Sequence, residues 1–146
     1  MKVEIDLIID SINKHFGDDA SFEDAAVVPG LFVAFCVNLD LISDTLRESS
    51  GRDFLRLKYR EITGPEFLIR SCGGELLENH LTSEGCKFAK QYYVDYVSRL
   101  KETVETPDAK WETYDRIAPW LTGCYFEGRT KKPNAFSKSR WWKFWN

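Results

Sequence analysis

Histidine and cysteine are the residue types of this chain from which a reactive or metal-binding site could most readily be built. The chain holds two histidines and four cysteines: His15, His80, Cys36, Cys72, Cys86 and Cys124. Cys72, His80 and Cys86 are close in the sequence, and Glu75 or Glu78 could supply a fourth ligand to a metal ion. Their spacing matches no standard zinc motif, so we expect no metal site.

Sequence motifs give no support to an enzyme. A Cys/His nucleophile needs surroundings that stabilise the thiolate, and no motif near these cysteines provides them. The sequence lacks a glycine-rich dinucleotide loop, a P-loop and an H-E-x-x-H helix. Carboxylate pairs such as Glu75 and Glu78 carry little information in a chain with 23 acidic residues. We therefore predict no catalytic residues, no cofactor and no enzymatic activity.

The sequence also indicates the cellular compartment. The cysteines form no C-x-x-C pair and are too few for a disulfide scaffold, so we expect reduced thiols that pack as small hydrophobic side chains. No apolar run reaches the roughly 18 residues that a membrane-spanning helix needs. Acidic Glu4 and Asp6 fall where a secretion signal would be apolar. These features together predict a cytoplasmic protein.

The stretch from Pro29 to Ile42 is the element that should position everything else. It carries no Lys, Arg or Glu, so other segments must cover it. Proline suits the first turn of a helix, and a helix starting there has one apolar stripe. The stripe comprises Phe32, Phe35, Cys36, Leu39, Ile42 and Leu46. A strand over residues 31–37 is the alternative, but it would not explain spacing that continues to Leu46.

Further helical patterns flank this central segment. We expect helices over residues 3–17, 52–62, 63–72, 82–105 and 108–121. Thr63 and Pro65 are start signals for the third of these, and paired glycines at 73 and 74 end it. Pro119 should kink or shorten the last one. The sequence thus predicts a mainly α, single-domain, irregular bundle of about five to six helices with a C-terminal extension.

Charge is divided unevenly along the chain. Residues 128–146 contain six bases and no acid, whereas residues 1–127 carry 14 Lys and Arg against 23 Asp and Glu, a net charge of −9. We therefore divide the chain into an acidic helical domain, residues 1–127, and a basic aromatic tail, residues 128–146. Such asymmetry is informative about partners rather than about the fold.

The tail holds three of the five tryptophans in its last six residues: Trp141, Trp142 and Trp145. Aromatic side chains alternating with bases suit nucleotide stacking, a membrane interface or a protein partner. We nevertheless expect the tail to pack on the acidic body, because an uncovered tryptophan cluster promotes aggregation.

Several short sequence blocks follow one another in an order that is typical of a protein family. They are Gly30–Phe35 (GLFVAF), Arg60–Leu68 (REITGPEFL), Cys72–Leu76 (CGGEL), Phe88–Tyr93 (FAKQYY) and Trp111–Pro119 (WETYDRIAP). In this order they resemble an uncharacterised family of small bacterial helical domains, whose members carry I-T-P-x-E-F-L and W-x-x-Y-D-x-I-A-P blocks. The likeness covers roughly residues 28–122.

Members of that family occur near bacterial toxin genes, and the resemblance therefore implies an immunity protein that binds a cognate toxin. Many such toxins are basic nucleases, which an acidic partner would meet rapidly and cover. The predicted partner-binding residues are exposed acids and tail aromatics: Asp18, Asp19, Glu23, Asp24, Glu102, Glu105, Trp141, Trp142 and Trp145. The alternative function is a nucleic-acid or membrane-surface adaptor that acts through the tail.

Overall fold

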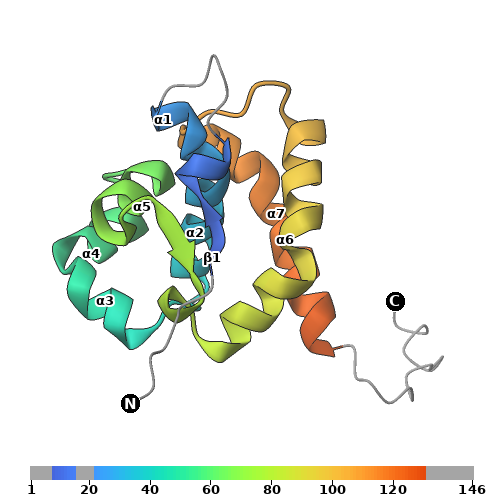
Figure 1. Cartoon of the computed structure of the whole chain (residues 1–146). Helices are drawn as coiled ribbons and strands as arrows, with labels where there is room; N and C mark the ends of the chain where they lie inside the picture. The colour runs from blue at the N-terminus through green and yellow to red at the C-terminus, as the bar shows by residue number, and fades with distance from the viewer. Residues whose placement is uncertain (1–7, 16–21, 131–146) are drawn as a thin grey trace.

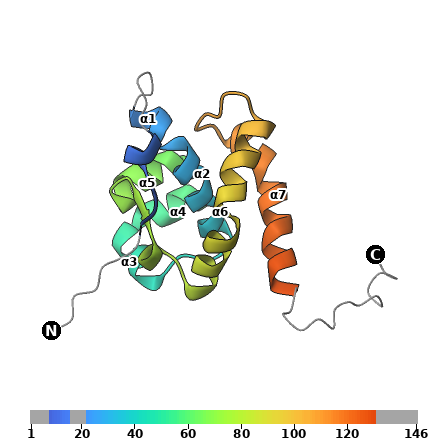
Figure 2. The ribbon, with the colours of Figure 1, turned by 45° about the vertical axis from the view of Figure 1, so that its right-hand side comes forward.

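A computed structural model of the chain describes residues 8–15 and 22–130 and confirms a mainly helical fold (Figure 1). In chain order the elements are β1 (Ile8–Ser11), η1 (Ile12–His15), α1 (Phe22–Ala25), α2 (Val27–Asn38), α3 (Asp44–Ser50), α4 (Arg52–Lys58), α5 (Gly64–Cys72), β2 (Glu75–Leu77), η2 (Glu78–His80), α6 (Ser83–Thr103) and α7 (Trp111–Thr130). Helix α2 lies among the others, and α6 and α7 lie side by side (Figures 1 and 2).

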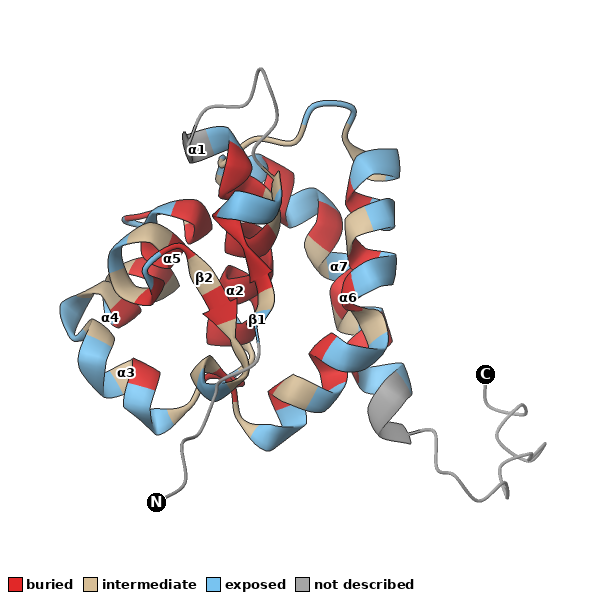
Figure 3. Cartoon of the chain, viewed as in Figure 1, coloured by how far each residue is buried: buried red, intermediate tan, exposed pale blue. Residues whose placement is uncertain are grey.

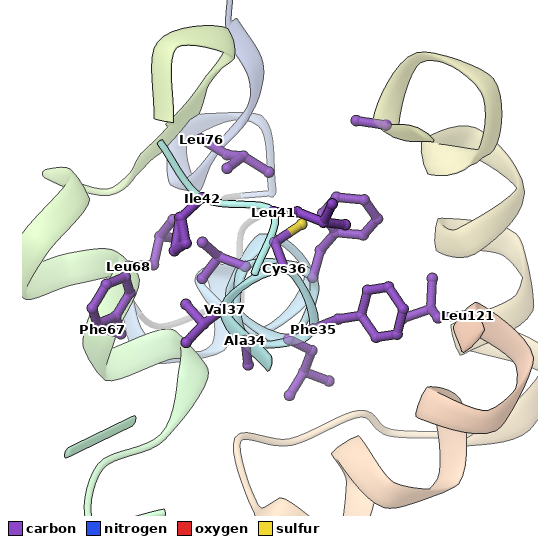
Figure 4. Packing of buried hydrophobic residues seen from close by; sticks show 14 of the residues in the cluster. Ala34, Phe35, Cys36, Val37, Leu41, Ile42, Phe67, Leu68, Leu76 and Leu121 are labelled. Carbon is purple, nitrogen blue, oxygen red and sulfur yellow. The ribbon is translucent and has the colours of Figure 1, made fainter. Parts of the chain in front are cut away.

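Helix α2 forms the centre of the core, as its composition predicts. Every residue from Leu31 to Val37 is buried, so the helix is covered on all sides (Figure 3). In Figure 4, Phe35 points from α2 toward Leu121 of α7, whereas Val37 points toward Phe67 of α5. One apolar helix therefore organises packing on opposite sides of the molecule.

The prediction that this helix continues to Leu46 is wrong. Helix α2 ends at Asn38, and Asp40 adopts a left-handed conformation with φ of 61°. The amides of Asp40 and Leu41 then donate to the carbonyl oxygens of Val37 and Cys36, at 3.2 and 2.8 Å. This is a Schellman ending, which usually uses glycine. The predicted helix over 52–62 also ends early, at Lys58, for the same reason.

Cap signals predicted two other helices correctly. Thr63 and Glu66 form a reciprocal capping box at the start of α5, and Gly73 ends that helix with φ of 66°. The Thr82 hydroxyl accepts a hydrogen bond from the Gly85 amide at 3.0 Å and so caps α6. Both helices therefore start where a side chain satisfies an otherwise unpaired backbone amide.

The N-terminal segment corrects a further prediction. Residues 8–15 form strand β1 and one 3-10 turn, not part of a helix over 3–17. β1 pairs antiparallel with β2, with Asp10 opposite Leu76 and Ser11 opposite Glu75. The Ile12 amide donates to the Gly74 carbonyl at 2.9 Å. Pairing with a segment more than 60 residues away in the sequence overrides the local helical pattern.

Helix α7 is longer than the sequence predicts. It passes through Pro119, which is exposed, and runs to Thr130. The predicted boundary between residues 127 and 128 therefore falls inside α7. Residues 131–146, with most of the predicted tail, lie outside the described residues.

Candidate partner-binding surface

The predicted acidic residues fall partly within the structure. Asp24 is exposed in α1, where Glu23 also lies, and Glu102 and Glu105 are exposed at and just beyond the end of α6. Asp18 and Asp19 lie outside the described residues. Figures 1 and 2 place α1 and the connection between α6 and α7 at the same end of the molecule. Acids that are about 80 positions apart in the sequence therefore lie on elements at the same end of the molecule. We call α1 and residues 101–116 the acidic end.

This end carries a net negative charge despite several bases. Residues 101–116 contain five acids and three bases, and α1 adds Glu23 and Asp24 without a base. All three bases, Lys101, Lys110 and Arg116, are exposed. The acidic end therefore offers a mixed surface with an acidic excess, which suits a basic partner.

Hydrogen bonds order the connection between α6 and α7. Asp108 accepts bonds from the Thr113 hydroxyl at 2.6 Å and from the Lys110 amide at 3.0 Å. These bonds, the first of them most, lower the pKa of Asp108 below its usual range. Arg116 donates to the Thr103 carbonyl at 2.9 Å and so ties α7 to the end of α6. Glu105 is consequently presented on a connection that is fastened at both ends.

A second charged arrangement at this end joins α4 to α7. Arg60 makes a two-pronged contact with Asp115, at 2.7 and 3.0 Å, and its guanidinium lies 4.5 Å from the centre of the Trp111 ring. Hydrogen bonds from Arg60 lower the pKa of Asp115. Sequence reasoning missed this pair because Arg60 takes a left-handed conformation after α4, with φ of 62°, instead of continuing a helix.

A buried polar cluster was also missed. Asp10 is 3% exposed and accepts hydrogen bonds from the Tyr93 hydroxyl, the Ser11 amide at 2.8 Å and the His15 ring at 2.7 Å. Burial, more than the neighbouring acid, raises the pKa of Tyr93 well above its ordinary value, so its hydroxyl keeps the proton that it donates. We call Asp10, His15 and Tyr93 the Asp10 cluster. The sequence predicted a helix over residues 3–17 and gave no indication of this cluster.

The cysteine thiols are poor nucleophiles in this setting. Burial raises the pKa of Cys36 far above that of a free thiol and that of Cys72 to about 12. Cys86 donates to the Glu78 carbonyl at 3.2 Å. The four cysteines are free, as predicted. Across residues 8–15 and 22–130, no three His, Cys, Asp or Glu side chains are placed to hold a metal ion.

The three predicted partner-binding tryptophans, Trp141, Trp142 and Trp145, lie outside the described residues. Helix α7, which precedes them, starts at the acidic end and runs away from it (Figures 1 and 2). In the described part of the chain, no helix is both long and apolar enough to cross a bilayer.

Comparison with known protein families identifies a family to which the chain is similar. A family model described as "Domain of unknown function (DUF7832)" matches residues 6–115, which include the N-terminal strand, the central helix and the start of α7. No curated protein matches the chain, and no solved structure does.

Proposed function

The chain belongs to the family described as Domain of unknown function (DUF7832), and we propose that it is an immunity protein. It binds a cognate bacterial toxin, for which a basic nuclease is the best fit, and covers the active or substrate-binding surface of that toxin. The chain itself breaks no bond. The observation that carries this proposal is the gathering of exposed Asp24, Glu102 and Glu105 at one end of the molecule.

Electrostatics supports a basic partner. The first 127 residues carry a net charge of −9, so a positively charged protein is attracted from a distance and its association is accelerated. Acidic side chains on the inhibitor would occupy the basic surface on which a nuclease holds phosphates. Binding and inhibition then follow from the same charges.

Rigidity supports docking without a large rearrangement. The connection that carries Glu105 is fastened by Asp108 at one end and by the bond from Arg116 to Thr103 at the other. A surface that is ordered before binding loses less conformational entropy when the partner arrives. The resemblance of the ordered sequence blocks to a family found near toxin genes supports the class of partner.

A growth assay tests the proposal. The open reading frame next to this gene is expressed in a bacterial host, alone and together with the full chain. We expect growth arrest without the chain and growth with it. A neighbouring product that is harmless, or that arrests growth equally in both strains, would contradict the proposal.

Charge-reversal variants locate the surface in the same assay. Glu102→Lys with Glu105→Lys should abolish protection. Glu48→Lys with Asp95→Lys makes the same change in net charge at exposed positions of α3 and the middle of α6, and should keep protection. Equal loss in both variants would indicate that net charge, and not the acidic end, matters.

The second candidate is an adaptor for nucleic acid or membrane surfaces. The six bases after residue 127 and the terminal tryptophans favour it. Binding of the full chain to RNA, DNA and anionic vesicles, measured at low and high salt, separates the two functions. Strong binding that salt weakens, and that deletion of residues 131–146 removes, would favour the adaptor.

A further inference from the structure

The N-terminal segment, residues 8–15, is held by a short sheet and by buried side chains. β1 pairs with the three-residue strand β2, and the ladder is irregular between Ile8 and Asp10. The Ile12 amide donates to the Gly74 carbonyl, and the Ile12 side chain is buried. Two-stranded sheets are marginally stable by themselves, so this segment needs further contacts to remain closed.

The Asp10 cluster supplies such a contact. Asp10 lies in β1, His15 ends η1, and Tyr93 comes from the middle of α6. The Tyr93 hydroxyl therefore bonds the N-terminal segment to the long helix α6. A buried carboxylate is costly unless hydrogen bonds compensate for its lost hydration, and here three groups donate to Asp10.

We propose that the Asp10 cluster is a clasp that keeps residues 8–15 closed on α6, and that this segment opens as a unit before the helical core unfolds. When the hydrogen bond from Tyr93 is lost, Asp10 is driven toward water, and it can reach water only if β1 leaves β2. The helices around α2 stay packed, because the main contacts of α2 are with α4, α5, α6 and α7 and not with residues 8–15.

The clasp also bears on the acidic end. Residues 16–21, with two predicted partner-binding acids, begin directly after His15 in the sequence, and η1 packs against α1. Opening of the clasp therefore also disturbs the contact between η1 and α1, and α1 is part of the acidic end. This consequence rests on the proposed function, whereas the clasp itself does not.

Hydrogen exchange of the full chain tests the clasp. The reporters are the Ser11 amide, which donates to Asp10, and the Ile12 amide, which donates to Gly74. In Tyr93→Phe these two amides should exchange about 10- to 100-fold faster, the range expected for losing a hydrogen bond to a charged group. Amides in the middle of α2 should change much less.

Tyr96→Phe is the matched control. Tyr96 is three residues further along α6, is also buried, and donates to the Val28 carbonyl in α2. Tyr96→Phe removes a hydroxyl from the same helix but leaves all three donors to Asp10 in place, so Ser11 and Ile12 should not exchange faster than the α2 amides. His15→Phe, at a position where the side chain is 23% exposed, removes a second donor and should accelerate the same two amides.

Two results would overturn the clasp. In the first, Tyr93→Phe accelerates β1 and α2 amides by the same factor, as a purely global loss of stability would. In the second, neither Tyr93→Phe nor His15→Phe changes exchange at Ser11 and Ile12. Faster exchange that is confined to β1, η1 and β2 in both variants supports it.

Discussion

Gly30 and Gly64 set the closest approach in the core, where α2 crosses the start of α5. A Cβ atom added to Gly30 would lie 2.5 Å from backbone atoms of Pro65, and one added to Gly64 would lie 2.2 Å from the Gly30 carbonyl oxygen. Neither backbone can move without separating the two helices. Only glycine fits at both positions, for reasons of space and not of backbone conformation.

Alanine at Gly30 should therefore be strongly destabilising. We expect Gly30→Ala to reduce the free energy of unfolding by about 3 kcal/mol, the upper range for overpacking a core. Gly123→Ala is the control, because a Cβ there meets nothing within 4 Å and α7 is helical at that point. It should raise stability by about 0.5–1 kcal/mol. Urea denaturation measures both, and a mild effect of Gly30→Ala would contradict the packing described.

Single residues also show where sequence reasoning stops. Gly73 ends α5 and was predictable, because glycine is the usual residue for a left-handed ending. Asp40 and Arg60 adopt the same conformation without being glycine, so the ends of α2 and α4 were missed. Asp10 was missed because its partner Tyr93 is 83 positions away, and no local pattern reports such a contact.

At the scale of elements, the capping box at the start of α5 is a direct test of local structure. Thr63→Ala removes the hydroxyl that accepts from the Glu66 amide. We expect a loss of about 1–2 kcal/mol in the free energy of unfolding. Thr63→Ser retains the hydroxyl and should remain close to wild type. If both substitutions lower the free energy of unfolding by the same amount, loss of the cap is not the cause of the destabilisation.

Asp53 links α4 and α5 and makes their contact dependent on pH. Its carboxylate accepts hydrogen bonds from Arg70 of α5 and Arg56 of α4, and these bonds, that of Arg70 foremost, lower its pKa below the ordinary 3.8. A lowered carboxyl pKa means that the stabilisation is complete above pH 3.8 and is lost as the pH falls through the folded-state value.

Asp53→Asn should therefore lower the thermal midpoint at pH 7, and the difference from wild type should shrink as the pH falls below 3.8. Arg70→Met removes the main cause of the lowered pKa of Asp53, so its difference in thermal midpoint from wild type should also shrink at acid pH. If the difference in thermal midpoint is the same at neutral and acid pH, the ion pairs of Asp53 are not the cause of the destabilisation.

The elements also divide by how predictable they are. The central apolar helix and the capped helices α5 and α6 follow from composition, periodicity and capping residues, all of which are local. Strand β1 does not, because its pairing with β2 depends on a chain reversal that brings residue 8 to residue 77. The length of α7 was underestimated, since Pro119 is on the exposed side of the helix and is tolerated there.

At the scale of the whole molecule, the fold places several of the acids of the sequence at one end. Helix α1 and the end of α6, which carry acids, lie at one end, and α7 runs from this end toward the other (Figures 1 and 2). The acidic excess was predictable from the sequence. That Asp24 and Glu105 share an end was not, because it depends on how α2 packs against α6 and α7.

Association kinetics between the full chain and the protein encoded beside it test the central claim most directly. If the acidic end steers a basic partner, the association rate constant should be high at low ionic strength and fall steeply with added salt. Glu102→Lys with Glu105→Lys should slow association by about tenfold or more at low salt, whereas Glu48→Lys with Asp95→Lys should slow it far less. An association rate that is insensitive to salt, or equally affected by both pairs of substitutions, would contradict docking through the acidic end.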